Sequence, residues 1–98
     1  MFYIYILYSP GSKRYYVGHT SDPARRLLEH NTTDKMKYTS KYRPWEMQLF
    51  FEVSEIRGEA IKIEKFIKRQ KSRQFLSELI TKGSDPGYIG RLLRYVLG

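Results

Sequence analysis

Two tyrosines, one arginine, one histidine and one glutamate are the side chains of this sequence best suited to do chemistry together. Tyr5 and Tyr16 lie in two aromatic, β-branched stretches that predict paired strands, so both hydroxyls reach one face of a hairpin if the register allows. Arg26 and His30 are four residues apart, which places them on one side of a helix. Glu64 is a lone acid in a strongly basic helical stretch further along the chain.

Together these groups meet the requirements of phosphodiester hydrolysis. One carboxylate can hold a Mg²⁺ ion that keeps most of its waters, and the ion polarises a phosphate oxygen and stabilises the leaving oxygen. An arginine neutralises the charge that collects on the phosphoryl oxygens. A tyrosine takes a proton from water only when nearby positive charge lowers its pKa well below about 10. The sequence has no tight carboxylate cluster and no HExxH motif, which argues against a two-metal nuclease and a zinc hydrolase.

Each of these residues also has a purely structural interpretation. A tyrosine in a strand is more often a core residue than a catalyst, and a histidine at a helix end is more often a partner of the helix dipole. Glu64 can form an i,i+4 ion pair with Lys68, worth a few tenths of a kcal/mol. Taken singly, each residue favours the structural interpretation, and only their combination favours a site.

The elements that would position these residues form a small α+β fold around a three-stranded sheet. Strands are predicted over residues 2–8, 14–19 and 47–53, and helices over residues 23–30, 56–67, 73–82 and 88–98. Asp22 before Pro23 predicts the start of the first helix, while Ser54 and Ser72 are the predicted caps of the next two. Residues 31–46 are predicted to be a long polar loop, a kind of segment that often carries function.

Hydrophobic periodicity predicts which faces of these elements are buried. The first strand is apolar on both faces, which is typical of a central strand covered on both sides. In the first helix, Arg26 and His30 would flank a buried stripe and so be anchored while still reaching solvent. The predicted buried sets are Ala24, Leu27 and Leu28 in the first helix, Met47, Leu49, Phe51 and Val53 in the third strand, and Ile56, Ala60, Ile63 and Ile67 in the second helix.

Composition favours a polyanionic partner and a soluble, cytoplasmic protein. The net charge is +8, with 18 lysines and arginines against 10 acids, and we favour nucleic acid over an unpartnered basic surface. The absence of cysteine excludes disulfides and thiolate metal sites. No apolar run approaches the roughly 20 residues needed to span a bilayer, and the N-terminus lacks the features of a signal peptide, so we expect no membrane partner.

The loop over residues 31–46 mixes cations with aromatic residues, a combination that suits phosphate contact and base stacking. The alternative is a solvated loop whose Trp45 fills the core. The two interpretations are balanced for the aromatics Tyr38, Tyr42 and Trp45, and phosphate contact is favoured for the cations. The predicted nucleic-acid-binding residues, including two from the basic stretch after Glu64, are Lys35, Lys37, Lys41, Arg43, Lys68 and Lys71.

Several motifs in the same order make the sequence resemble a GIY-YIG nuclease domain of the small, single-domain bacterial type. Tyr3-Ile4-Tyr5 matches the first half of the name, with tyrosine in place of glycine, and Tyr16-Val17-Gly18 matches the second. The similarity runs from about residue 2 to residue 80 and continues through VGHTSDPARRLLEHN, KYTSKYRPWEMQLFFE and EAIKIEKFIKRQKSR. Many nucleases of the family carry an asparagine after the metal-binding glutamate, whereas here none follows Asn31.

The resemblance implies a three-stranded antiparallel sheet flanked by helices and one-metal hydrolysis of DNA. It implies that Tyr16 or Tyr5 orients or deprotonates the attacking water and that Arg26 stabilises the transition state. His30 would assist near the nucleophile or the leaving group, and Glu64 would bind Mg²⁺ or Mn²⁺. His19, which directly follows the second half-motif, is an accessory candidate.

Three functions are therefore open. We favour a metal-dependent DNA endonuclease, structure-directed or weakly sequence-specific, with repair or recombination as the context that the family suggests and a protein partner as a source of specificity. The second is a nucleic-acid-binding module with little catalysis, and the third is a docking module that uses residues 88–97. We expect residues 1–83 to form the domain and residues 84–98 to form a turn and short helix packed on it, which favours a core role for that segment.

Overall fold

The aromatic N-terminal segment forms the middle of a three-stranded antiparallel sheet with strand order β2-β1-β3. The computed structural model describes residues 1–98. The strands are β1 (Phe2–Ser9), β2 (Arg14–Thr20) and β3 (Glu46–Ser54). The predicted α+β class and antiparallel sheet are confirmed, and each predicted strand lies within the observed one.

Five helices complete the fold, one more than predicted: α1 (Pro23–Thr32), α2 (Lys37–Ser40), α3 (Arg57–Arg69), α4 (Arg73–Lys82) and α5 (Pro86–Leu97). Asp22 caps α1 and Ser72 caps α4, each accepting a backbone N–H bond as predicted. The predicted cap of α3 is wrong, because Ile56 holds the N-cap position while the Ser54 hydroxyl accepts from Ile56 N at 2.9 Å. The predicted loop over residues 31–46 contains the end of α1 and all of α2.

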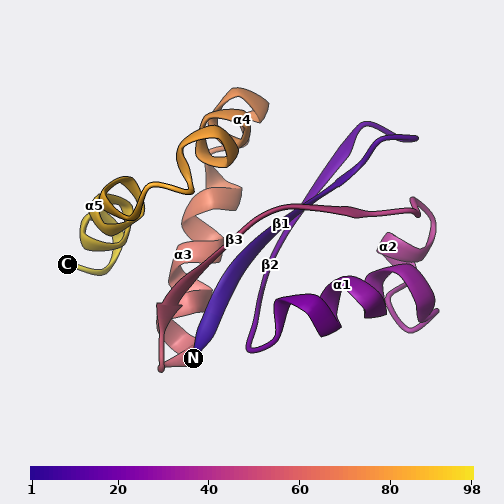
Figure 1. The fold of residues 1–98 in the computed structure, drawn as a ribbon, viewed down its shortest axis with the longest axis horizontal. Coiled ribbons are helices and arrows are strands. Elements are labelled where there is room, and N and C mark those ends of the chain that lie inside the picture. The colour runs from indigo at the N-terminus through magenta and orange to yellow at the C-terminus, as the bar shows by residue number, and fades with distance from the viewer.

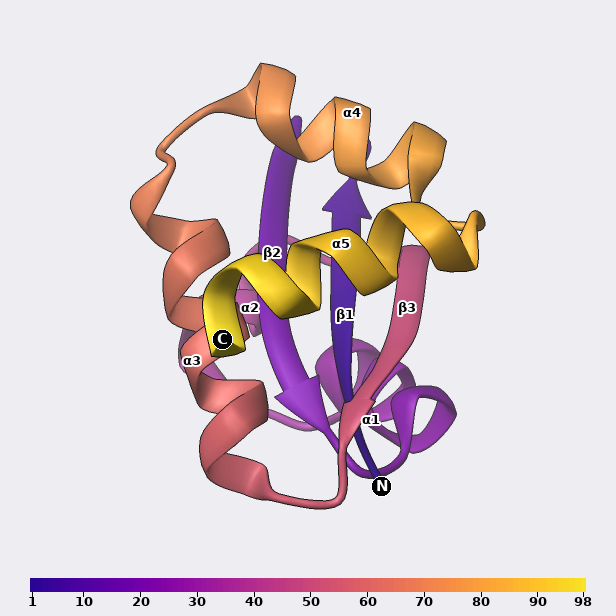
Figure 2. The same cartoon turned by 90° about the vertical axis from the view of Figure 1, so that its left-hand side faces the viewer.

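The helices cover the two faces of the sheet unequally. Figure 1 shows α1 and α2 on one side of the sheet and α3, α4 and α5 on the other. In Figure 2, α5 crosses in front of the sheet, α4 lies across its upper end, and α3 runs beside the edge strand β2. None of the helices is long and apolar enough to cross a membrane.

Each face of the sheet has its own hydrophobic cluster, so β1 is covered on both sides as predicted. The α3 side is the larger cluster, and Ile89 of α5 belongs to it, which supports a core role for the C-terminal helix. The α1 side is built from Tyr5, Leu7 and Trp45. Trp45 is 2% exposed and donates its indole N–H to Thr39 O at 2.8 Å, so it is a core residue.

Three of the predicted buried positions are wrong, because the helices present neighbouring residues inward. Ala24 and Leu28 of α1 are exposed, and the helix turns its fully buried His30 toward the sheet instead. Ile56 lies before the first turn of α3 and is 61% exposed, while the later residues of that stripe are buried. On α1 the inward face is therefore partly polar, which is unusual unless the polar groups are hydrogen-bonded or functional.

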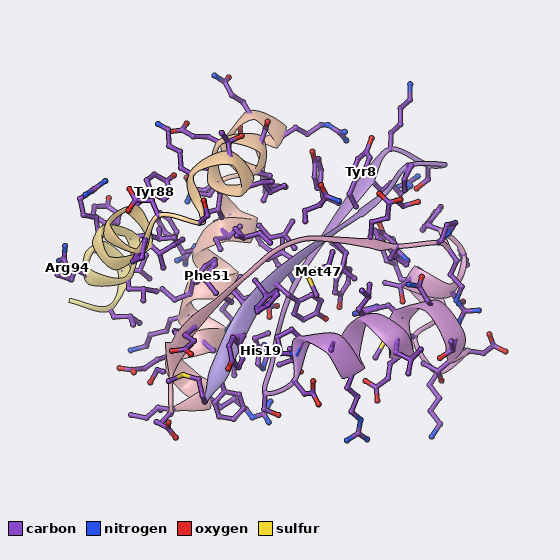
Figure 3. The ribbon with its side chains drawn as sticks, in the orientation of Figure 1. Tyr8, His19, Met47, Phe51, Tyr88 and Arg94 are labelled. Atoms are coloured by element: carbon purple, nitrogen blue, oxygen red, sulfur yellow. The ribbon has the colours of Figure 1, made fainter.

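The predicted single face of β3 is also wrong at its start. The register shifts between Ile6, which pairs with Leu49, and Leu7, which pairs with Met47, so Gln48 is an extra residue in β3. Such a bulge turns the residues before it to the opposite face. Met47 consequently packs with the Tyr5 cluster while Phe51 belongs to the α3-side cluster; both are labelled on β3 in Figure 3.

Candidate active site

Tyr5 lies at the centre of the sheet, where its phenol crosses β2 to reach α1. Its neighbour in register is Gly18, and a Cβ atom at position 18 would lie 2.6 Å from the Tyr5 hydroxyl oxygen. That separation is far too short for two non-bonded atoms, so position 18 must be glycine for the phenol to take this path. The Tyr5 hydroxyl lies 2.7 Å from Nε2 of His30, and both residues are at most 1% exposed.

A directed chain of hydrogen bonds joins the sheet, α1 and α2. The Thr39 hydroxyl donates to Met36 O at 3.3 Å and therefore accepts from Nδ1–H of His30 at 3.0 Å. The second ring nitrogen, Nε2, is then unprotonated and accepts the O–H of Tyr5. Every polar atom of this buried chain has a partner, which is the condition for such groups to be tolerated in a core.

The electrostatics keep both members of the Tyr5–His30 pair neutral. Burial, assisted by the positive charge of Arg26, lowers the pKa of His30 to about 4. Burial also raises the pKa of Tyr5 above its ordinary value, with repulsion from Tyr16 and Glu64 adding to the effect and Arg26 opposing it. Near neutral pH the pair is therefore a neutral phenol bonded to a neutral imidazole, and neither group is poised to act as a charged acid or base.

Arg26 of α1 places a positive charge near the Tyr5–His30 pair. Its Nη1 donates to Glu29 at 3.2 Å, which tethers the side chain along the helix. Burial disfavours the charge, but the neighbouring Tyr5 and Glu29 side chains outweigh this effect and raise the pKa of Arg26. Nε of Arg26 is buried without a hydrogen-bond partner. A buried donor without a partner is rare and costly, and it often marks a place where a ligand or a water belongs.

Tyr16 is the outermost tyrosine of the group and lies on the same face as Tyr5, as the alternation predicted. The centroids of the two phenol rings are 6.2 Å apart, and the Tyr16 ring is 4.7 Å from the His30 ring. Unlike Tyr5, Tyr16 is only partly buried, because β2 is an edge strand. Tyr16 lines a surface hollow.

Glu64 approaches from α3, on the other side of the edge strand. Lys68 Nζ lies 2.7 Å from one carboxylate oxygen and His19 Nδ1 lies 2.7 Å from the other. Burial opposes ionisation, but these two hydrogen bonds outweigh it and lower the pKa of Glu64. Lys68 Nζ also lies 5.8 Å from the centroid of the Tyr16 ring, so one lysine connects the carboxylate of α3 to the tyrosine across the edge of the sheet.

His19 was only an accessory candidate from the sequence, yet it holds Glu64 directly. Arg57 Nη1 lies 3.3 Å from Nε2 of His19, and an arginine can only donate, so Nε2 accepts and the ring proton sits on Nδ1. His19 then donates Nδ1–H to Glu64 and fixes the orientation of the carboxylate. Figure 3 labels His19 at the end of β2, where that strand passes close to α3. The alternation of β2 was a usable signal, since it places His19 on the same face as Val17 and hence toward α3.

The cations that the sequence assigned to nucleic acid divide into two groups. Five of these cations are exposed, as phosphate contact requires: Lys35, Lys37, Lys41, Lys68 and Lys71. Arg43 instead uses its donors within the fold, since it bonds the backbone oxygens of His30 and Thr33 and the carboxylate of Asp34. It closes the C-terminal end of α1 onto the α2 loop. Asn31 is likewise structural, because its side chain bonds Trp45 N and O at 2.7 and 3.0 Å.

The chemistry of the donor set fits a single hard divalent cation. There is no group of three or more histidine, cysteine, aspartate or glutamate side chains that could enclose a metal. A Mg²⁺ ion does not need one, because it is commonly bound by one or two carboxylates, several waters and the phosphates of the substrate. Glu64 supplies one carboxylate that stays ionised at neutral pH and is 18% exposed. One oxygen of Glu64 already contacts a positive charge, the ammonium of Lys68.

Most of the sequence is similar to known proteins. The sequence matches the GIY-YIG catalytic domain over residues 1–76. It is 39% identical over 71 residues to a UPF0213 protein of Listeria welshimeri, covering 72% of this chain and 78% of that protein. A UPF0213 protein of Listeria innocua is 42% identical over 67 residues, 65% of this chain and 73% of that protein.

A third relative is much longer than this chain. It is the structure-specific endonuclease subunit slx1 of Aspergillus terreus, which is 38% identical over 95 residues. The match covers 92% of this chain but 23% of that protein.

Proposed function

The chain belongs to the GIY-YIG family of catalytic domains, and from this membership we propose that it is a metal-dependent DNA endonuclease that hydrolyses phosphodiester bonds. The observation that carries the proposal is the position of Lys68. It contacts the carboxylate of Glu64 at 2.7 Å and borders the ring of Tyr16, so the candidate metal ligand and the candidate hydroxyl meet at one edge of the sheet.

Glu64 would hold the divalent ion, Mg²⁺ or Mn²⁺. The bound ion would polarise the phosphate and stabilise the oxygen that leaves. His19 orients the carboxylate by its hydrogen bond, and the lowered pKa of Glu64 keeps the carboxylate negative. Lys68, which bonds the other oxygen of Glu64, would supply a further positive charge beside the phosphate.

Tyr16 is the tyrosine that we assign to the attacking water. It is partly exposed, borders a surface hollow and lies near the cation of Lys68, whereas Tyr5 is buried and its pKa is raised. The hydroxyl of Tyr16 would orient a water toward phosphorus by accepting a hydrogen bond from it. The water oxygen would form the new bond to phosphorus and lose its proton to solvent, while the bond to the ester oxygen on the opposite side breaks and that oxygen takes up a proton from solvent.

Arg26 would neutralise the charge that develops on the phosphoryl oxygens. Its side chain is 37% exposed and its guanidinium carries more donors than the one bonded to Glu29, and an arginine can bind a phosphate through two parallel hydrogen bonds. We assign Tyr5 and His30 to positioning Arg26 rather than to proton transfer. Both are neutral and withdrawn from solvent, and the positive charge of Arg26 acts on the pKa of each.

DNA is the substrate that the surface and the relatives favour. The net charge of +8 suits a polyanion, and five exposed lysines named above can contact phosphates, whereas Arg43 is left out because its donors are used within the fold. Because relatives are named as subunits of structure-specific endonucleases, we propose recognition of DNA structure rather than sequence, with repair as a context and a protein partner as a source of specificity.

The test is cleavage of supercoiled, branched and single-stranded DNA with Mg²⁺, Mn²⁺ or chelator. We expect metal-dependent cutting that falls by at least about 100-fold in Glu64→Gln and in Arg26→Ala. Glu78→Gln is the matched control, because Glu78 also forms an i,i+4 pair with a lysine, Lys82, but on α4. Unchanged cutting in both site variants would overturn the proposal.

A DNA-binding module with little catalysis is the second candidate. The observation that favours it is that both oxygens of Glu64 are already bonded to protein groups. It predicts DNA binding that weakens with salt but is indifferent to Mg²⁺ and to Glu64→Gln. Metal-dependent turnover in the experiment above would eliminate this candidate.

A further inference from the structure

The hollow beside Tyr16 extends beyond the residues to which the chemistry proposed above gives a role. It has a volume of about 300 Å³, and its walls include Tyr16 of β2, Tyr38 of α2, and Lys68 and Lys71 at the end of α3. A second hollow shares Tyr38 and Lys71 and adds the cations Arg14 and Arg73. Two residues on the walls of the first hollow, Tyr16 and Lys68, also belong to the candidate active site. The hollow is therefore continuous with that site.

The walls combine flat aromatic surface with positive charge and contain no acidic side chain. Tyr38 is 49% exposed, so part of its side chain is open to a ligand. Its ring is held from the side by Tyr42, at 5.2 Å and 62° between the ring planes. The Tyr16 ring lies 6.5 Å away from it at a tilt of 33°. A volume of this size is at the lower limit of ligand pockets and suits one small planar group.

We propose that the hollow beside Tyr16 binds one unstacked nucleobase of the DNA substrate. The base would stack on Tyr38, and Lys71 would hold the phosphate of the same nucleotide. An aromatic ring stacks on any of the four bases, and cations around it hold the backbone, which is how proteins bind single strands without reading their sequence. The proposal rests on the proposed function in one respect, namely that the ligand is the DNA that the neighbouring site cuts.

The position of the hollow makes it a determinant of substrate structure. Since it shares Tyr16 and Lys68 with the candidate active site, a base bound here belongs to a nucleotide close to the phosphate that is attacked. A base inside an intact duplex is stacked on both sides and can enter only after extrusion, which costs a few kcal/mol. Single strands, flaps and gaps offer an unstacked base without that cost, so we expect the protein to favour them over intact duplex.

The test measures stacking directly and needs no cleavage. A single-stranded oligonucleotide in which every adenine is the fluorescent analogue 2-aminopurine is titrated with protein in the presence of a chelator. Stacking on a tyrosine quenches this fluorophore. We expect quenching by the native protein and by Tyr38→Phe, and loss of quenching with about 5- to 100-fold weaker binding in Tyr38→Ala, because base–aromatic stacking is worth about 1–3 kcal/mol. Tyr95→Ala, which removes a 78%-exposed ring from α5, is the matched control and should behave as native.

Quenching in Tyr38→Ala equal to that of the native protein would overturn the proposal. Lys71→Ala provides an independent check should Tyr38→Ala fail to fold. It should weaken binding and lower the salt dependence by about one counterion, and unchanged salt dependence would count against the phosphate contact. Cleavage is assayed separately with Mg²⁺ or Mn²⁺. Quenching that depends on Tyr38, without any cleavage, would support the base-binding site and contradict the nuclease proposal. Cleavage without such quenching would support the nuclease proposal and contradict the base-binding site.

Discussion

The hydroxyl of Tyr5 donates to Nε2 of His30 at 2.7 Å, from a central strand to a helix, in a part of the core that solvent does not reach. Burial leaves both groups neutral, so the bond is a structural connection between the sheet and α1. This connection fixes the part of α1 that carries Arg26. We therefore propose separate tasks for the two tyrosines, positioning for the buried Tyr5 and chemistry for the partly exposed Tyr16.

Substituting each tyrosine by phenylalanine should separate these tasks. Tyr5→Phe leaves Nε2 of His30 buried without a donor, and we expect a loss of about 1–3 kcal/mol in the free energy of unfolding. Its cleavage should stay within about tenfold of native. Tyr16→Phe should unfold like the native protein but lose about 100-fold or more in cleavage rate. Urea titration and single-turnover cleavage measure the two effects, and equal losses of cleavage in both variants would contradict the assignment.

The stability of the protein should fall as the pH is lowered through the range in which His30 would titrate. The folded-state pKa is about 4, below the ordinary value of 6.5, so the unfolded chain binds the proton more readily. Stability is then intact above about pH 6.5 and is lost progressively down to about pH 4, by up to about 3 kcal/mol. Urea midpoints between pH 4 and pH 8 measure the effect. His30→Gln should flatten this part of the profile, and an unchanged slope in that variant would assign the effect to other groups.

Gly18→Ala should act on the site through Tyr5. The added Cβ atom would meet the Tyr5 hydroxyl oxygen at 2.6 Å, so the phenol must move and its bond to His30 must weaken. We expect a loss of about 1–3 kcal/mol in unfolding free energy. Gly11→Ala is the control, since a Cβ atom there meets nothing within 4 Å. In a Tyr5→Leu background the cost of Gly18→Ala should shrink, and a cost that persists in that background would mean that the clash lies elsewhere.

The fold was predictable where local pattern and packing agree. Alternation in β1 and β2 placed Tyr5 and Tyr16 on one face, and the register confirms it. The pattern failed in α1, where the apolar Leu28 faces solvent and the polar His30 faces the sheet. From the sequence alone, a polar histidine is expected at the surface. His30 is buried because it has hydrogen-bond partners, Tyr5 and Thr39, in other parts of the chain.

The remaining errors have similar physical origins. The face of the sheet on which Met47 lies depends on the bulge at Gln48, and no residue type in that stretch predicts a bulge. The link between His19 and Glu64 spans 45 residues of sequence, and periodicity describes only the faces of each element. The sequence could place His19 on the α3 face of β2, but which α3 side chain it meets depends on how the helix packs against the sheet.

His19→Asn should change the metal requirement more than the maximal rate. His19 donates to one oxygen of Glu64 at 2.7 Å and is itself held by Arg57, so its loss leaves the carboxylate free to rotate. Groups that orient a metal ligand typically contribute 10- to 100-fold in metal affinity. We therefore expect the Mn²⁺ concentration for half-maximal cleavage to rise by about that factor, with the rate at saturating metal within a few-fold of native. Arg57→Ala should give a smaller shift of the same kind, because its contact with His19 is longer and exposed. A rate that falls without any change in metal requirement would place His19 outside the orientation of Glu64.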